Sequence, residues 1–137
     1  MKRNNSRIKA MMLVYNYDIT NGNCDDELPS IISEELEEVD ELFASELFTG
    51  VINNIDEIDF IISKNLENYG LDRLNYVDRA LIRIGTYEMK YLKTPKNIVI
   101  NEIVNLSKQY TQIDDYPSSK FNNKLLDNIA RYLENDK

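Results

Sequence analysis

The chain has 137 residues, which is enough for one domain that buries roughly two thirds of the surface exposed by its unfolded form. It contains one cysteine, Cys24, and no histidine, so an internal disulfide and a cysteine-rich metal site are excluded and the most common general base is missing. The net charge of −8 is unevenly spread, because residues 1–9 carry four basic residues and no acid, whereas residues 10–63 carry fourteen acids and no Lys or Arg.

This charge pattern leaves room for an anionic partner. A basic segment that lies farther than about one Debye length, roughly 8 Å at physiological salt, from an acidic face can still attract phosphate. The sequence has no run of about 18 apolar residues, and its N-terminus has no secretory apolar segment. We therefore expect a cytoplasmic protein that does not enter a membrane.

Helical periodicity begins close to the N-terminus. Apolar residues recur every three to four positions between Ile8 and Ile19, which predicts a first helix. A cap is expected among the polar residues 4–6, and a polar loop containing Gly22 should end the helix.

Three further helices are expected before residue 70. Pro29 suits the first turn of a short acidic helix that extends to Val39. The next two helices are predicted over Leu42–Val51 and Ile55–Leu66. We favour a break between them, because Asn53, Asn54 and Asp56 offer a cap for a new helix.

The fifth predicted helix, Asn75–Leu92, is apolar around most of its circumference and should be central to the fold. Its polar residues form one narrow stripe, which consists of Arg79, Arg83, Thr86 and Lys90. Asn75, followed by Asp78 three residues later, resembles a capping arrangement. Gly85 in this helix and Gly50 in an earlier one each lower helix stability by about 1 kcal/mol relative to alanine. Close approach of another helix is the simplest explanation for a glycine at both positions.

Two more helices complete the prediction. Thr94 and Pro95 indicate an entry to a sixth helix that runs toward Tyr110. Ser118 or Ser119 can cap a seventh, whose apolar face comprises Phe121, Leu125, Ile129 and either Tyr132 or Leu133. The sum is an all-α fold of about seven helices with no predicted strand.

One acid falls on the apolar side of the fifth helix. Glu88 follows Val77, Leu81 and Ile84 at helical spacing, so it should be partly buried and must have a partner. We hypothesise that Glu88 or Glu102 pairs with Arg79 or Arg83, in a structural and not a catalytic role. No pair of acids stands out for carboxylate catalysis.

Several segments, in this order, resemble the transcription antitermination factor NusB family. The resemblance is carried by VDRALIRIGTYEM at Val77–Met89, INE at Ile100–Glu102 and KFNNKLLD at Lys120–Asp127. Shorter matches add Arg7, Ala10, Tyr15, Gly50, Val51, Asn54, Ile58 and Asp59.

The resemblance implies two packed helical bundles, here an N-terminal subdomain of about 1–70 and a C-terminal subdomain of about 71–137. It also implies a non-enzymatic protein without a cofactor that binds boxA-like RNA together with NusE, a small-subunit ribosomal protein. The assembly joins RNA polymerase and supports antitermination, especially on ribosomal RNA operons. Such proteins can form homodimers, which would cover the RNA face.

The resemblance places RNA contacts at both ends of the match. The basic residues Lys2, Arg3, Arg7 and Lys9 can attract phosphate, although a solvated terminus is the alternative. Tyr15 and Phe121 match positions that contact bases or ribose; for Tyr15 we favour core packing, and for Phe121 both roles stay open. Ser118 and Lys120 could reach RNA, or they could cap and solvate the last helix.

Asp78 matches a position where the family meets NusE, and helix capping explains it equally well. We group Glu88 with Asp78 as a partner-binding candidate. Four residues depart from the family pattern, namely Met12, Thr111, Pro117 and Lys124. Pro117 and Lys124 bear on the RNA contacts and not on the fold, and an outward-facing Lys124 would add positive charge beside Lys120.

Two other readings remain open. A helical adaptor that binds proteins but not RNA is the main alternative. The length of the chain argues against an enzyme, because NusB-like domains fused to RNA cytosine methyltransferases need a catalytic domain for which no residues remain. The acidic stretch Asp25–Glu46 is either a solvated face or a docking surface for a basic ribosomal protein.

Overall fold

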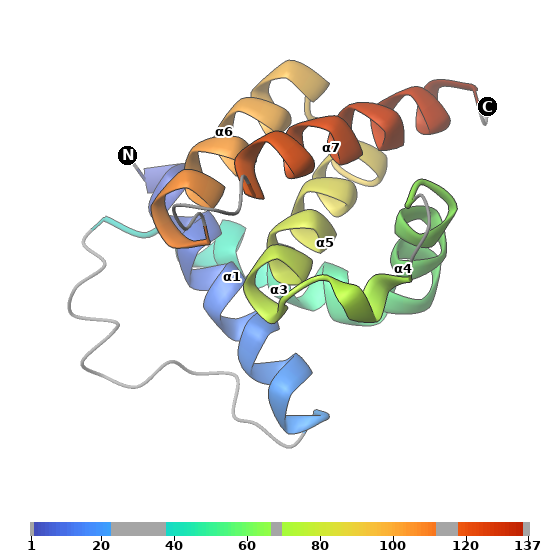
Figure 1. Cartoon of the computed structure of the whole chain (residues 1–137). Coiled ribbons are helices and arrows are strands. Elements are labelled where there is room, and N and C mark those ends of the chain that lie inside the picture. Colours follow the sequence, from blue (N-terminus) through green and yellow to red (C-terminus); the bar gives the residue numbers. More distant parts are fainter. Residues whose placement is uncertain (1, 23–37, 67–69, 112–117, 136–137) are drawn as a thin grey trace.

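The computed structural model describes residues 2–22, 38–66, 70–111 and 118–135 (Figure 1). Within these ranges the fold is all-α, as predicted. The elements are α1 (Lys2–Thr20), α3 (Glu41–Asn53), α4 (Ile55–Lys64), the 3-10 turn η1 (Leu71–Arg73), α5 (Tyr76–Lys90), α6 (Lys96–Tyr110) and α7 (Ser118–Asn135). Most of the helix predicted to begin at Pro29 lies outside the described residues.

The first helix begins earlier than predicted. Because α1 starts at Lys2, the polar residues 4–6 lie inside the helix and do not cap it. Ser6 instead joins two elements, since its hydroxyl accepts from the Asp40 N–H at 2.8 Å and lies 3.2 Å from the Asp40 carbonyl oxygen. The helix ends as expected, because Gly22 adopts a φ of 88° and its N–H donates to the Tyr17 carbonyl at 3.0 Å.

The predicted break between the third and fourth helices is confirmed, and Asn54 of the predicted cluster stands at the N-cap position of α4, but without a side-chain capping hydrogen bond. Helix α3 ends at Asn53 and α4 begins at Ile55. Asn54 separates them and makes no side-chain cap to α4; its Nδ2 donates back to the Gly50 carbonyl at 2.8 Å. The side chain therefore adds a second hydrogen bond to the Gly50 carbonyl, which also accepts from the Asn54 backbone N–H at 3.2 Å.

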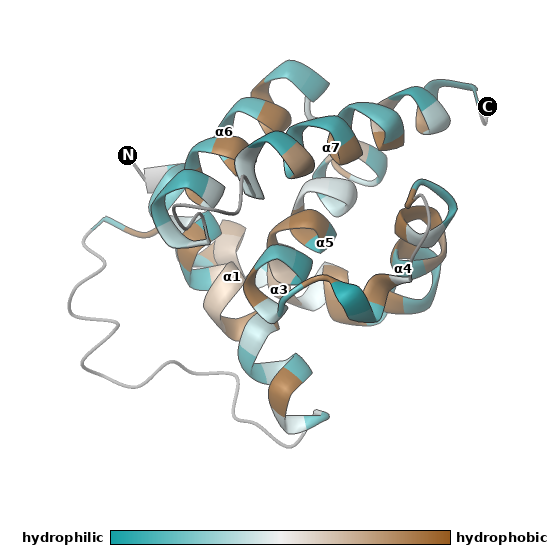
Figure 2. Ribbon diagram, in the orientation of Figure 1, coloured by the Kyte–Doolittle hydropathy of each residue, from teal (hydrophilic) through white to brown (hydrophobic). Residues whose placement is uncertain are grey.

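Helix α5 is central, as its apolar circumference predicted. It contacts α1, α3 and α4 as well as α6 and α7, and every residue from Ala80 to Met89 is buried. Figure 2 shows hydrophobic residues on the inner sides of the helices and hydrophilic residues on the outer sides of α6 and α7. The predicted cap is confirmed, because Asn75 Oδ1 accepts from the Asp78 N–H at 2.8 Å.

Close helix contacts explain both internal glycines, as predicted. A Cβ at Gly50 would lie 2.1 Å from Cζ of Tyr87 in α5. A Cβ at Gly85 would lie 3.0 Å from Leu126 Cδ2 and 3.3 Å from Ile103 Cγ1. Helix α5 therefore approaches α3, α6 and α7 at points where a larger side chain does not fit.

The buried apolar residues form one continuous cluster that includes members of every α-helix described. The division into subdomains near residue 70 stays a prediction. Among the described residues, no helix combines the length and apolar character needed to cross a membrane.

Candidate functional site

The basic N-terminal segment contributes a buried ion pair. Arg7 of α1 donates from Nε and Nη2 to the two carboxylate oxygens of Glu88 in α5, both at 2.7 Å. The two side chains are 4% and 0% exposed. Glu88 therefore has the partner that its burial required, but the hypothesis that an arginine of its own helix supplies it is wrong.

The negative charge of Glu88 stabilises the charged form of Arg7. Burial by itself lowers the pKa of the Arg7 guanidinium, but the hydrogen bonds and charge of Glu88, with a contribution from Glu102, outweigh it and raise the pKa above its ordinary value. The guanidinium is thus fixed, charged and covered. We withdraw Arg7 from the RNA contacts and Glu88 from the partner contacts, because neither side chain reaches the surface.

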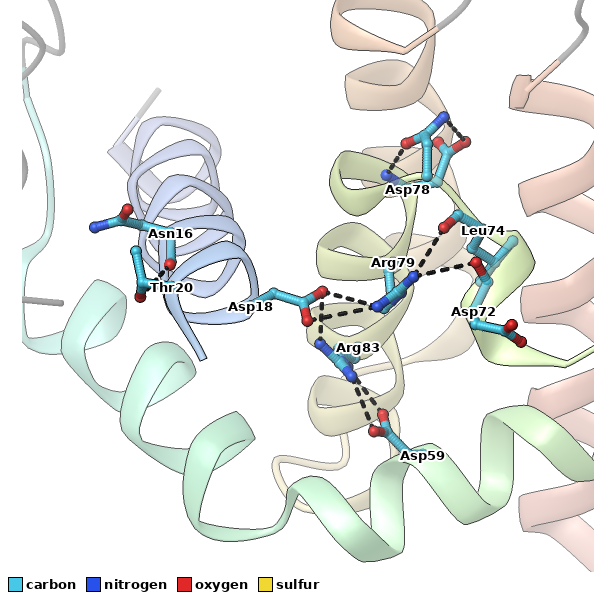
Figure 3. A network of polar contacts seen from close by, with 10 residues as sticks. Asn16, Asp18, Thr20, Asp59, Asp72, Leu74, Asp78, Arg79 and Arg83 are labelled. Atoms are coloured by element: carbon cyan, nitrogen blue, oxygen red, sulfur yellow. Dashed lines mark hydrogen bonds and ion pairs between the residues drawn. The ribbon is translucent and has the colours of Figure 1, made fainter. Parts of the chain in front are cut away.

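The two arginines of the polar stripe on α5 bind residues of other elements (Figure 3). Arg83 donates from Nε and Nη2 to Asp59 of α4 at 2.8 and 2.9 Å, and its Nη1 lies 3.2 Å from Asp18 of α1. Arg79 also reaches Asp18, at 3.2 Å, and donates to the Leu74 carbonyl at 3.1 Å. These two arginines join α1, α4 and the entry to α5, so they are structural.

Asp78 is also interior, at 1% exposure. Its Oδ2 accepts from Asn75 Nδ2 and its Oδ1 from Asn122 Nδ2, both at 2.9 Å. Asn122 of α7 donates further to Ser107 Oγ of α6 at 2.8 Å. The capping explanation is therefore confirmed, and Asp78 in addition connects α5 to α6 and α7 in place of an exposed partner contact.

The remaining basic residues of α1 lie nearer to solvent. Arg3 is exposed, and its guanidinium carbon lies 4.3 Å from the centre of the Phe43 ring. Lys9 Nζ lies 2.6 Å from a carboxylate oxygen of the exposed Glu41. Nothing is described of the Lys2 side chain. The segment thus holds one solvent-facing arginine in a defined position and one lysine already in a surface ion pair.

The first turns of α7 present two further lysines. Lys120 and Lys124 are both exposed and stand four residues apart, so they share one face of the helix. Ser118 is buried, and its hydroxyl donates to the Thr111 carbonyl at 3.2 Å, which is a structural role. Phe121 is half-buried against the apolar cluster. Pro117 lies outside the described residues.

Tyr15 does not lie in the core, which was the position that we favoured for it. Its side chain is 37% exposed, and its ring meets that of Tyr76 edge to face with centroids 6.3 Å apart. Tyr76, at 46% exposure, is an aromatic residue that the sequence analysis did not single out. Tyr15 is flanked by Val14 and Asn16, and Tyr76 by Asn75 and Val77, so their immediate neighbours gave no signal of surface exposure.

An open groove of about 380 Å³ lies between the N-terminal turns of α1 and helix α6. Its lining comprises Arg3, Asn4, Arg7, Glu102, Asn105, Leu106 and Gln109. The sequence analysis missed the amides in this groove. The polar positions 102, 105 and 109 recur at helical spacing, and that was the available signal.

Comparison with known protein families gives a match over nearly the whole chain. The model of the NusB family matches residues 4–131. The transcription antitermination protein NusB of Listeria innocua is 37% identical over 131 residues, which cover 95% of this chain and 97% of that protein.

Solved structures agree with this match. The structure of T. maritima NusB aligns with a TM-score of 0.76 and 31% identity, covering 96% of this chain and 93% of that chain. A crystal structure of antitermination factors NusB and NusE in complex with dsRNA aligns with a TM-score of 0.72 and 30% identity, covering 95% and 96% of the two chains.

Proposed function

Because the chain belongs to the NusB family, we propose that it is a transcription antitermination factor that binds boxA-like single-stranded RNA of nascent ribosomal transcripts together with the ribosomal protein NusE. In this role it supports the processivity of RNA polymerase and has no enzymatic step and no cofactor. A protein that acts on nascent bacterial transcripts works in the cytoplasm, so we propose that location for this chain.

One observation carries the proposal. The chain aligns over 95% of its length with a NusB chain whose structure holds both NusE and dsRNA. A match over 95% of this chain with a TM-score of 0.72 supports the proposal that this chain meets the same partners. That structure holds double-stranded RNA, so binding of single-stranded RNA is a further part of the proposal, which the RNA titration below tests.

The RNA contacts that we propose come from basic and aromatic residues of α1 and α7. Lys2, Arg3 and Lys9 of α1 supply positive charge at one end, and Lys120 with Lys124 of α7 supplies it at the other. Tyr15 and Phe121 offer ring surface for stacking on unpaired bases. The departure at Lys124 therefore adds to the positive charge beside Lys120.

A second candidate function is a helical adaptor that binds proteins but not RNA. The ion pairs of the N-terminal basic residues favour this second candidate, because Arg7 is buried against Glu88 and Lys9 is paired with Glu41. Fewer cations are then available for phosphate than the sequence suggests. The exposed acids of α3, Glu41 and Glu46, suit a basic protein partner under either candidate.

A salt-dependent RNA titration separates the two candidates. The purified chain is titrated with boxA-like RNA, the same RNA scrambled, and a duplex of it, each with and without the ribosomal protein NusE. Contact with three or four phosphates of a single strand predicts a log-log slope of about −2 to −3. Absence of binding in the presence of NusE would establish the adaptor, and equal affinity for the boxA-like and scrambled RNA would leave only nonspecific attraction.

Matched lysine variants locate the contact. Lys120→Ala and Lys124→Ala should each weaken RNA binding and reduce the magnitude of the slope by about 0.7. Lys96→Ala is the control, because Lys96 is an exposed lysine at the first residue of α6, where it pairs with Glu134. An equal loss in all three variants would contradict the proposed position of the RNA.

A further inference from the structure

We propose that the ring of Tyr76, the first residue of α5, stacks on an unpaired RNA base next to the base that contacts Tyr15. The inference rests on the proposed function and extends the RNA surface from α1 and α7 to the start of α5. The two rings meet edge to face, with centroids 6.3 Å apart and planes at 80° to each other. A strand that stacks one base on Tyr15 therefore has a second aromatic ring within reach of a neighbouring base.

Both rings are accessible to a ligand. The side chain of Tyr15 is 37% exposed and that of Tyr76 is 46% exposed. Stacking on a base would remove apolar ring surface from water, which is favourable. Unpaired bases in single-stranded RNA have free faces for such a contact, and every base offers one.

Arg79, which follows Tyr76 by three residues, holds the Tyr76 ring in place. Its guanidinium carbon lies over the ring, 4.9 Å from the centre. The guanidinium is itself anchored, because it donates to the Leu74 carbonyl at 3.1 Å and to Asp18 at 3.2 Å (Figure 3). A ring that is already fixed by its neighbours loses little freedom when a base stacks on it, so the entropic cost of binding is low.

The charges near Tyr76 permit a phosphate backbone. Arg73, three residues before Tyr76, is exposed and forms no ion pair with any residue that the structure describes. Asp18 is already bound by two arginines of α5, whereas Asp72 is exposed next to Arg73. Arg73 can therefore contact a phosphate, and Asp72 should weaken RNA binding at the same surface.

RNA titrations of aromatic variants test the stacking, with NusE present throughout. Tyr76→Ala should weaken the binding of boxA-like RNA by at least about fivefold and leave the salt dependence unchanged, because stacking releases no counterions. Tyr76→Phe keeps the ring and should keep the native affinity. The matched control is Phe60→Ala, which removes an aromatic side chain of α4 that is 55% exposed and should leave the affinity unchanged.

A double variant distinguishes a base contact of Tyr76 from mere support of the Tyr15 ring. If Tyr76 only held Tyr15 in position, Tyr76→Ala would have no effect in a chain that already carries Tyr15→Ala. A base stacked on Tyr76 itself predicts a further loss of about fivefold in that background. The lack of a further loss would overturn the inference.

Asp72→Asn gives a test that a folding defect cannot imitate, because a gain of binding is expected. Removal of this negative charge beside the RNA should strengthen binding by about two- to threefold at low salt, and less as the salt concentration rises. Arg73→Ala should weaken binding and reduce the magnitude of the log-log salt slope by about 0.7. Asp56→Asn, which removes an exposed acid of α4, is the control and should leave the affinity unchanged. Native affinity of both the Asp72 and the Arg73 variant would show that RNA does not pass the start of α5.

The outcomes separate this inference from the proposed function. If RNA binds but Tyr76→Ala keeps the native affinity, the second stacking position is overturned and the RNA-binding function stands. If Tyr76→Ala weakens the binding of NusE in the absence of RNA, the ring is a protein contact and the inference is likewise overturned. If no RNA binds in the presence of NusE, the inference and the proposed function both fail.

Discussion

Arg7 and Glu88, which are 81 residues apart in sequence, form a buried bidentate ion pair that joins the first helix to the central helix α5. Both hydrogen bonds are 2.7 Å long. Each carboxylate oxygen accepts one hydrogen bond, and the two bonds together fix the plane of the guanidinium. A residue that the family resemblance assigned to RNA is thereby a structural link in this chain.

Breaking this pair should be costly. Arg7→Ala or Glu88→Ala leaves an uncompensated buried charge, so we expect a loss of about 3–5 kcal/mol in the free energy of unfolding. The double variant Arg7→Met/Glu88→Met should lose much less than the two single variants combined, because no charge remains buried. Urea unfolding followed by circular dichroism measures these changes.

Lys9→Ala is the matched control for that measurement. Lys9 lies on the same helix and pairs with the exposed Glu41, so its removal should cost less than about 1 kcal/mol. Equal costs for Arg7→Ala and Lys9→Ala would contradict the buried role of Arg7.

Asp78→Ala tests whether this residue is structural or a partner contact. The substitution leaves amide donors of Asn75 and Asn122 without their acceptor, so we expect a loss of about 1–3 kcal/mol in stability. Affinity for NusE, measured by calorimetry at a temperature where the variant is folded, should stay unchanged. A large drop in that affinity with native stability would reverse the assignment.

Gly50→Ala should destabilise the protein despite the better helix propensity of alanine. The added Cβ would meet the Tyr87 ring at 2.1 Å, and such overpacking costs about 1–3 kcal/mol, more than the roughly 1 kcal/mol that alanine gains. Thermal unfolding should show the decrease, and Tyr87→Leu in the same chain should restore part of it.

Gly70→Ala is the control, because it is exposed, has a φ of −92° and faces only the movable Asp72 carboxylate at 3.0 Å. A melting temperature for Gly50→Ala at or above that of Gly70→Ala would show that α3 and α5 can separate without cost.

Alkaline pH should weaken the fold through Tyr91. Burial, with added effects of Glu57 and Tyr87, raises the pKa of Tyr91 to about 12 from an ordinary value of 10.0. The unfolded chain therefore releases this proton first, and the stabilisation is complete below pH 10 and is lost as the pH rises toward 12. The stability difference between the native chain and Tyr91→Phe, measured by denaturant titration, should shift in favour of the variant over this interval. A constant difference would refute the assignment.

Tyr15→Ala should affect RNA binding more than stability. The side chain is 37% exposed and meets the Tyr76 ring edge to face, so its loss should lower the free energy of unfolding by about 1 kcal/mol. Loss of a stacked base should weaken RNA binding by roughly 1–3 kcal/mol, measured by fluorescence anisotropy. Ile19→Ala, an exposed apolar residue one turn later on α1, should leave the affinity unchanged. Equal effects of the two variants would argue against stacking.

Much of the fold followed from periodicity and caps along the chain. The circumference of apolar residues placed α5 at the centre, Asn75 and Asp78 marked its start, and Gly50 and Gly85 marked close helix contacts. These signals are local, because a helix repeats every 3.6 residues and its cap lies within one turn. For the same reason the family resemblance, which depends on residue order, could be recognised without coordinates.

The use of each polar side chain was decided only by tertiary structure. From the sequence, Arg7 and Lys9 are two similar cations on one segment, yet packing of α1 on α5 buries the first against Glu88 and leaves the second in a surface ion pair. The groove lined by Asn4 and Glu102 likewise exists only because α1 and α6 meet. Sequence spacing determines which face of a helix a residue occupies, whereas the partner that covers or exposes that face comes from distant parts of the chain.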